Sequence, residues 1–144
     1  MYSVSEPVSP EDFAKIFNLR FDVLRAPWNQ SRGSEKDENE SSAIHALIKD
    51  ESGKCIASGR LQFNNAEEGQ IRFMAVETEY RGHGLGKMIL DFLEQKAKAN
   101  NTFSIVLQAR ENALQFYERA GYINEGKSFL LFDAVQHYRM RKQL

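Results

Sequence analysis

Cysteine is nearly absent from this chain. Its 144 residues include one cysteine, Cys55, so no disulfide bond can form within the chain. This usage is typical of a reducing compartment, and we expect a cytoplasmic protein. Cys55 alternates with Ala57 and Gly59 in a strand-like segment, which predicts a buried structural thiol rather than a nucleophile. No group of His, Cys and Asp residues has the spacing of metal ligands, so the sequence predicts no metal site.

An excess of either charge and a long apolar run are also lacking. The 19 Lys and Arg residues nearly balance the 20 Asp and Glu residues, which gives a net charge of −1. Without a strong positive field we expect no nucleic-acid partner. Because no segment reads as a membrane span or a secretory leader, we expect no membrane partner. The length and the hydrophobic content of 42% predict one globular domain over residues 1–144.

The spacing of hydrophobic residues predicts an α/β fold with a single mixed sheet covered by helices on both faces. The run 102–109 is apolar throughout, which favours a strand that lies parallel to its neighbour. A turn is expected near Gly126, between the last two strands. Strands are predicted at residues 2–8, 43–49, 55–63, 70–76, 102–109, 122–125 and 131–140.

Three helices are predicted between these strands. The first has Ser9 as its cap and Pro10 at its first position, and it ends at Ala26-Pro27. Residues 28–42 indicate a long loop or a frayed second helix. The next helix follows the glycine-rich segment and stops at Asn100-Asn101, and the last covers residues 112–120 with Gly121 as a left-handed cap.

The most informative segment joins the predicted strand 70–76 to a helix through the sequence Arg81-Gly-His-Gly-Leu-Gly-Lys87. Glycines at alternate positions let the backbone come close to a ligand. The N–H groups at the start of the following helix have no partner within it and attract anions, phosphate above all. The flanking Arg81 and Lys87 add positive charge. The segment therefore predicts a bound phosphate or pyrophosphate, and with it a nucleotide-like cofactor.

Two common phosphate-binding motifs do not fit this segment. A P-loop requires glycine where Arg81 stands and a magnesium-binding hydroxyl where Met88 stands. Both mismatches count against nucleoside triphosphate chemistry. In the dinucleotide motif the last two glycines are separated by one residue more than in the series Gly82, Gly84 and Gly86, and no early βαβ unit surrounds them.

The spacing that fits is Arg/Gln-x-x-Gly-x-Gly/Ala, here Arg81, Gly84 and Gly86. It resembles the acyl-CoA-binding motif of the GNAT acyltransferase superfamily, and the strand 73–76 before it is similar to that family's cofactor strand. A second segment, residues 109–122, is similar to the family's later motif. In that motif an Asn opens a helix beside the CoA arm, and a Tyr on the helix faces the sulfur.

The resemblance implies a GNAT-like fold and an acyl-CoA-dependent N-acyltransferase. It would most often transfer acetyl from acetyl-CoA to a primary amine of a small molecule or peptide, by direct attack in a ternary complex. Backbone N–H groups would hold the pyrophosphate, and the cofactor strand would pair with the pantetheine arm. The cofactor-binding residues that the resemblance implies are Met74, Ala75, Val76, Arg81, Gly82, His83, Gly84, Leu85, Gly86, Lys87, Asn112 and Phe116.

Acyl transfer needs a polarised carbonyl, a neutral amine and a protonated leaving group. A backbone N–H near residues 74–76 would polarise the thioester. An alkyl amine with a pKa of about 10.4 is almost fully charged at pH 7, so a base or a water wire must take its proton. Tyr117 is the general-acid candidate for the leaving thiolate. Gln70 stands where family members often have a Glu base. The substitutes are Glu68, Glu79, His45 and His137, or a water wire without a dedicated base.

The acceptor is hardly encoded in the sequence. The family usually places the loop that holds residues 31–42 beside the acceptor groove, and acids exceed bases in it, which would favour a cationic amine. A solvated mobile loop is the alternative. Arg20, Arg25 and Trp28 could line the groove instead and select an anionic acceptor. The charged residues of the loop are Glu35, Asp37, Glu38 and Glu40 against Arg32 and Lys36.

Two further expectations stay open. Gln70 in place of an acid is compatible with a non-catalytic acyl-CoA-binding module on the same fold, a sensor or an assembly partner. The presence of Asn112 and Tyr117 speaks against that alternative. The resemblance also implies a homodimer formed through the late strands.

Overall fold

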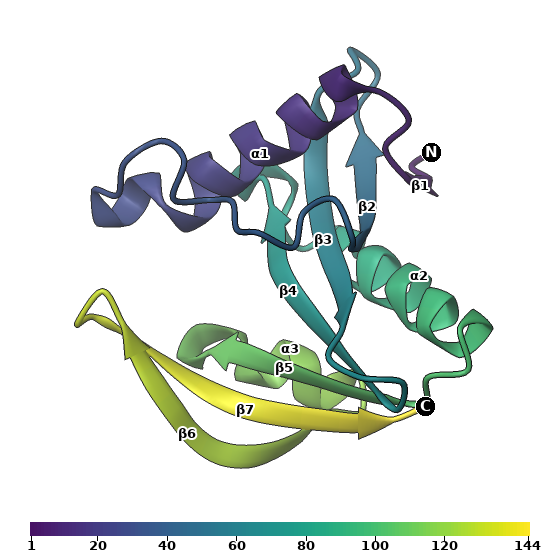
Figure 1. Ribbon diagram of the computed structural model, residues 1–144. Helices are drawn as coiled ribbons and strands as arrows, with labels where there is room; N and C mark the ends of the chain where they lie inside the picture. The colour runs from purple at the N-terminus through teal and green to yellow at the C-terminus, as the bar shows by residue number, and fades with distance from the viewer.

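Seven strands form one mixed sheet in the computed structural model, which describes all residues from 1 to 144 (Figure 1). Their order across the sheet is β1-β2-β3-β4-β5-β7-β6, and only β4 and β5 are parallel neighbours. The strands are β1 (Val4–Ser5), β2 (Ile44–Lys49), β3 (Cys55–Phe63), β4 (Glu68–Val76), β5 (Ser104–Arg110), β6 (Ile123–Leu131) and β7 (Val135–Gln143). The α-helices are α1 (Pro10–Leu24), α2 (Leu85–Ala99) and α3 (Leu114–Arg119), and the 3-10 turns are η1 (Ala26–Trp28), η2 (Thr78–Tyr80) and η3 (Glu111–Ala113).

Helices cover both faces of the sheet, as predicted. α1 packs on one face against β3 and β4, and α2 packs on the other face against β2 and β3 (Figure 1). Successive residues of β2 show the two faces, because Leu47 belongs to the core beneath α1 while Ala46 and Ile48 belong to the core beneath α2 and α3. β3 is therefore buried without interruption from Cys55 to Leu61, although its sequence alternates between apolar and polar residues.

The sheet splits between β4 and β5. These strands pair only from Glu68–Ile71 against Ser104–Leu107, and beyond that point they diverge (Figure 1). A bulge in β4 centred on Phe73, whose φ is +57°, shifts the register against β3 at the same level. Gly59 lies opposite the bulge, where a Cβ would stand 2.6 Å from Met74 Sδ, so only glycine fits. The fold thus leaves the carboxyl half of β4 with one free edge.

The predicted helix ends are confirmed where capping residues mark them. Ser9 Oγ accepts a hydrogen bond from Asp12 N at 3.2 Å, and Pro10 occupies the first position of α1. Gly121 follows α3 with φ +99°, the left-handed conformation predicted for it. The last helix is shorter than predicted, because residues 111–113 form the 3-10 turn η3 before α3 begins.

The turn predicted near Gly126 is wrong. Gly126 has φ +115° but lies at a bulge inside β6, which continues to Leu131. The chain reverses instead at Phe132 and Asp133, two residues with positive φ that carry no glycine signal in the sequence. β1 is also shorter than predicted, because only Val4 and Ser5 pair with β2.

A buried ion network holds the segment between α1 and β2 against the sheet. Asp37 accepts hydrogen bonds from both terminal nitrogens of Arg60, at 2.6 and 2.9 Å, and the Arg60 side chain is fully buried. Glu40 Oε2 lies 2.9 Å from Arg20 Nη1 and 3.0 Å from Arg60 Nη1. Asp37 and Glu40 therefore neutralise arginines of the protein itself, whereas Glu38 stays exposed to solvent.

We expect Asp37→Asn to lower the free energy of unfolding at pH 7. Hydrogen bonding to Arg60 lowers the pKa of Asp37 from 3.8 to about 2. A depressed carboxyl pKa stabilises the fold above the unfolded value and loses that effect as the pH falls through the folded value, so the expected loss is about 2 kcal/mol at neutral pH. Urea unfolding should show roughly half of this difference at pH 3.

Glu38→Gln is the matched control in the same loop. Glu38 is exposed, so its substitution should change the free energy of unfolding by less than about 0.5 kcal/mol. Equal effects of the two substitutions would show that the Asp37–Arg60 pair does not stabilise the loop.

Candidate functional site

A cavity of about 740 Å³ lies where β4, α2 and α3 meet the end of α1. We name it the glycine-turn cavity, since the turn before α2 forms one wall. Every predicted site residue lines it except His83. This residue is exposed in the turn and does not line the cavity. The predicted residues that line it are Met74, Ala75, Val76, Arg81, Gly82, Gly84, Leu85, Gly86, Lys87, Asn112, Phe116 and Tyr117.

The glycine turn presents free backbone N–H groups to this cavity. Gly82 and Gly84 have φ values of +82° and +79°, which L side chains rarely adopt. The first helical hydrogen bond runs from Met88 N to Gly84 O, so the N–H groups of residues 85–87 have no partner within α2. A Cβ at Gly86 would lie 3.2 Å from the Phe116 ring, which explains the third glycine by close packing. Free N–H groups at the start of a helix are a geometry suited to an anion.

The free edge of β4 forms another wall. Glu77 N donates to Ile56 O of β3, and backbone groups of successive strand residues point to opposite sides. The polar backbone groups of Met74 and Val76 therefore point away from β3, toward the edge that β5 has left. An extended ligand can pair with them as an added strand would.

Tyr117 is a buried tyrosine whose hydroxyl makes no hydrogen bond within the protein, while its neighbour Tyr122 donates to Glu94 Oε2 at 2.8 Å. Burial raises the pKa of the Tyr117 phenol, and the positive charge of Arg110 opposes that rise only in part. The phenol is therefore protonated throughout the neutral range and available as a donor. Tyr117 also lines a second cavity, so it stands where two cavities meet.

The second cavity, of about 320 Å³, lies between the diverging ends of β4 and β5 and the β6–β7 hairpin. We name it the arginine cavity, because Arg25, Arg72 and Arg110 line it and no acidic side chain does. Arg25 was predicted to line a groove; Arg72 and Arg110 were not predicted. Arg110 could have been found, since it ends the apolar strand β5 beside the second motif, and sites gather at the carboxyl ends of parallel strands.

His137 is the candidate base that the arginine cavity contains. Its Nδ1 lies 3.0 Å from Val135 O and its ring stacks on Phe129, with centroids 4.4 Å apart. A ring that donates from Nδ1 carries its lone pair on Nε2, which has no partner within the protein. Burial lowers the pKa of His137, and the charges of Arg110 and Arg25 lower it further, so the ring is neutral at pH 7.

The other candidate bases lie elsewhere. His45 is enclosed in the ion network, with Nε2 2.8 Å from Glu40 O and Nδ1 3.3 Å from Arg20 Nη2. Glu68 lies at the closed end of β4, where it pairs with Arg139 and Arg141.

Glu79, a further candidate base, is exposed in η2 and lines neither cavity, while Gln70 lines the arginine cavity. Arg20, which was predicted to line the acceptor groove, lies instead in the buried ion network with Glu40.

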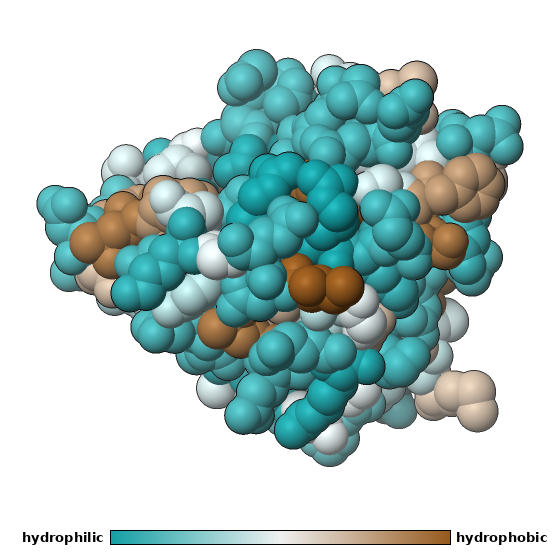
Figure 2. All heavy atoms as spheres, turned by 90° about the horizontal axis from the view of Figure 1, so that it is seen from below, coloured by the Kyte–Doolittle hydropathy of each residue, from teal (hydrophilic) through white to brown (hydrophobic).

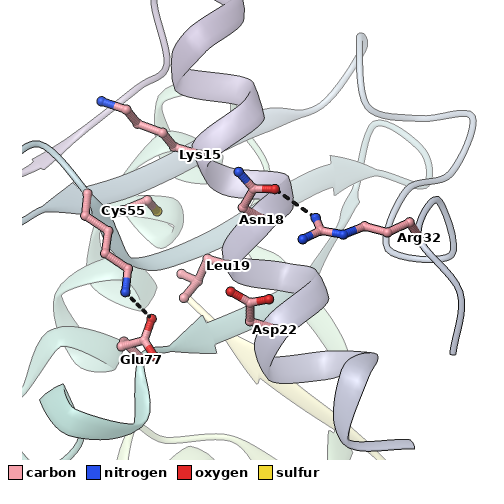
Figure 3. Close-up of a pocket in the computed structure, with 8 residues that line it drawn as sticks. Lys15, Asn18, Leu19, Asp22, Arg32, Cys55 and Glu77 are labelled. Atoms are coloured by element: carbon pink, nitrogen blue, oxygen red, sulfur yellow. Dashed lines mark hydrogen bonds and ion pairs between the residues drawn. The ribbon is translucent and has the colours of Figure 1, made fainter. Parts of the chain in front are cut away.

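A further hollow of about 350 Å³ lies beside α1, outside both cavities (Figure 3). Two contacts cross it, since Arg32 donates to Asn18 Oδ1 at 2.8 Å and Lys54 lies 3.3 Å from Glu77. Cys55 at its base donates to Ala57 O, and burial raises the pKa of this thiol to about 12, as expected for a structural cysteine.

The sequence matches the family model of the acetyltransferase (GNAT) family over residues 13–122. The chain belongs to the GNAT family. The motif resemblance noted in the sequence is thereby confirmed, and the order and packing of the sheet are those of GNAT structures.

Two curated relatives of this GNAT protein come from Bacillus subtilis (strain 168). One, named as an acetyltransferase, is 35% identical over 75 residues, which span 52% of this chain and 50% of that protein. The chain thus matches about half the length of that relative. Another, named "Uncharacterized N-acetyltransferase YjcF", is 26% identical over 132 residues and covers 92% of this chain and 93% of that protein.

Solved GNAT structures show the same fold. A Lactobacillus plantarum protein described as an N-acetyltransferase superposes with a TM-score of 0.87 at 23% identity, covering 99% of this chain and 98% of that one. A GNAT family acetyltransferase from Elizabethkingia anophelis with acetyl-CoA bound superposes with a TM-score of 0.78 at 16% identity, covering 99% and 98%.

The face of the molecule seen in Figure 2 is mainly hydrophilic, with its hydrophobic groups lying apart rather than in one patch. No helix is long and apolar enough to cross a membrane. No three His, Cys, Asp or Glu side chains lie together in a way that would hold a metal ion.

Proposed function

We propose that this GNAT protein is an acetyl-CoA-dependent N-acetyltransferase whose acceptor is a primary amine of a small molecule or peptide. The observation that carries the proposal is the place of Tyr117, at the meeting point of two cavities and with no partner for its hydroxyl. One cavity can hold a thioester and the other an amine, so that both reach the same phenol. Location in the cytoplasm and a single domain over residues 1–144 remain part of the proposal.

Acetyl-CoA fits the glycine-turn cavity in its chemistry, and it supplies an activated acetyl group as thioester. The free N–H groups of residues 85–87, with Arg81 at the rim, would hold the pyrophosphate. The free edge of β4 at Met74 and Val76 would pair with the pantetheine arm and direct an N–H to the thioester oxygen.

His137 and Tyr117 then have separate roles in the acyl transfer. A bond forms between the amine nitrogen and the carbonyl carbon, and the carbon–sulfur bond breaks. We assign the proton that leaves the nitrogen to His137 Nε2, the free lone pair of the arginine cavity. Tyr117 donates a hydrogen bond to the departing thiolate. Since burial raises the pKa of Tyr117, this donor stays protonated when the thiolate leaves.

His137→Gln tests the base. We expect kcat/KM at pH 7 to fall about tenfold, because a water wire can replace a general base in part. The wild type should also lose activity in acid as His137 becomes protonated. Because the pKa of His137 is lowered, this loss should occur below pH 6.5, and the variant should lack it once the ionisation of the amine is corrected for.

His45→Gln is the control for that pH profile. His45 lies in the ion network and lines neither cavity. Its substitution should therefore lower stability but leave the loss of activity at low pH, the acid limb of the pH profile, in place. Loss of the acid limb in His45→Gln, or its retention in His137→Gln, would move the base assignment away from His137.

The decisive experiment for the function has two steps. Calorimetric titration with acetyl-CoA, compared with 3′-dephospho-CoA and ATP, should show micromolar binding selective for acetyl-CoA. CoA release over a broad panel of amines should then identify acceptors. Tight binding without any CoA release would favour the non-catalytic acyl-CoA-binding module, which the amide of Gln70 in the arginine cavity permits.

A homodimer through the late strands is included in the proposal. β6 is an edge strand of the sheet, and it exposes Ile123, Phe129 and Leu130. Light scattering behind size-exclusion chromatography would show a mass of one chain or of two.

A further inference from the structure

Three guanidinium groups converge on the arginine cavity without a matching number of carboxylates. Arg72 shares the single carboxylate of Asp37 with Arg60, at 3.1 Å from Arg72 Nη1. Neither Arg25 nor Arg110 forms an ion pair with any acidic side chain. The cavity therefore has a local excess of positive charge in a protein whose net charge is −1.

Arg25 and Arg110 also meet at one atom. Arg25 Nη1 donates to Leu24 O at 3.1 Å, and Arg110 Nη2 donates to the same oxygen at 3.2 Å. Two like charges are thus held close together by a neutral carbonyl, which cannot balance them. Aromatic rings help to orient them, since Arg110 lies 4.5 Å from the Trp28 centroid and Arg25 lies 5.7 Å from that of Phe73.

We infer that the arginine cavity binds an anionic group of the acceptor, which is then a primary amine that also carries a carboxylate or a phosphate. This inference rests on the proposed function and names its substrate class. Guanidinium groups bind both anions through paired N–H donors, and a bound anion would balance the charges of Arg25 and Arg110. Two of the four acids of that loop, Asp37 and Glu40, are already paired with arginines, so the loop offers a cationic acceptor less negative charge than its composition suggests.

The place of the anion sets the place of the amine. Arg110, Tyr117 and Met74 line both cavities, whereas Arg25 and His137 line only the arginine cavity. An acceptor anchored between Arg25 and Arg110 therefore starts beside the residues that face the thioester. A short aliphatic chain between the anion and the amine then brings the nitrogen toward Tyr117, with His137 on the same cavity wall.

Substitution of Arg25 can test anion binding by the acceptor separately from cofactor binding. Arg110 also lines the glycine-turn cavity and could contact a phosphate of CoA, but Arg25 does not line that cavity. Removal of the Arg25 charge should therefore weaken the acceptor and leave acetyl-CoA unaffected.

The test compares four amines of similar length with the wild type, Arg25→Gln and Arg32→Gln. The probes are propylamine, β-alanine, 2-aminoethyl phosphate and 1,3-diaminopropane. Arg32 is the control, because it is an exposed arginine that pairs with Asn18 and lines neither cavity. In the wild type, kcat/KM for an anionic amine should exceed that for propylamine by at least about tenfold. The diamine should be the poorest acceptor.

In Arg25→Gln this advantage should fall below about threefold, with the acetyl-CoA Kd unchanged, while Arg32→Gln should keep it. Whether β-alanine or 2-aminoethyl phosphate is preferred distinguishes a carboxylate from a phosphate. Preference for propylamine or the diamine would overturn the inference. An equal loss for all four probes in Arg25→Gln, or weaker acetyl-CoA binding in that variant, would overturn it too.

A binding measurement keeps the two proposals separate. If no amine releases CoA, the proposed enzyme fails, but the anion subsite can still be tested on CoA-saturated protein. The anionic amines should raise the melting temperature of the wild type and of Arg32→Gln, and not that of Arg25→Gln. Equal shifts in all three proteins, or no shift in any, would count against the subsite.

Discussion

Gly84→Glu should abolish acetyl-CoA binding while the protein remains folded. Gly84 has φ +79°, and no atom lies within 4 Å of a Cβ placed there, so a side chain would meet no steric obstacle from the protein. The left-handed backbone would cost about 1–2 kcal/mol. A carboxylate at the start of α2 would occupy the place of the pyrophosphate and repel it. We expect calorimetry to show a Kd at least about 100-fold weaker.

Gly126→Glu is the matched control for this substitution. Gly126 also has a positive φ, +115°, and open space around it, but it lies in the edge strand β6 away from both cavities. Both variants place a side chain at positive φ and add the same charge, so both melting temperatures should fall. Normal acetyl-CoA affinity in Gly84→Glu would show that the phosphate site has been placed wrongly.

Local signals explain why most of the fold could be predicted from the sequence. Ser9 and Pro10 fix the start of α1 through a cap and a missing N–H, and Gly121 ends α3 through its backbone freedom. These effects act within one helical turn, so a single sequence carries them. The turn after β6 was predicted at the wrong place because it lacks such a local signal. Phe132 and Asp133 adopt positive φ, although neither is a glycine.

The candidate site likewise contains one part that local sequence motifs predict and one part that only the fold brings together. The glycine turn and Tyr117 lie in two contiguous motifs, which a linear reading can find, and their residues do line one cavity. The arginine cavity draws Arg25, Arg72 and Arg110 from three separate elements, and only the splitting of β4 from β5 brings them together. No local pattern encodes that convergence.

The acidic loop shows why charge counts alone mislead. The charge count favours a solvated or substrate-facing acidic excess, yet Asp37 and Glu40 face the buried Arg60. Arg60 itself stands at a polar position of an alternating strand, which would normally face water. Pairing across twenty or more residues of sequence decides where these charges lie, and no acid of this loop lines the arginine cavity.

Tyr117→Phe should lower kcat about 100-fold with little change in the acetyl-CoA Kd. The substitution removes only the hydroxyl, which makes no hydrogen bond within the protein, and leaves the ring packed against Phe116 and Tyr122. A donor that acts on the developing thiolate matters in the transition state and hardly at all in the ground state. Stability should change little, because the hydroxyl that is removed makes no hydrogen bond within the protein.

Tyr122→Phe has the opposite expected signature and serves as the control. Its hydroxyl donates to Glu94 Oε2 at 2.8 Å within the core, so the variant should lose about 1–2 kcal/mol of stability and keep its kcat. Single-turnover CoA release and thermal unfolding of both variants separate the two roles. If Tyr117→Phe turns over normally, water or another group must stabilise the departing thiolate, because the one free phenol between the two cavities is then dispensable.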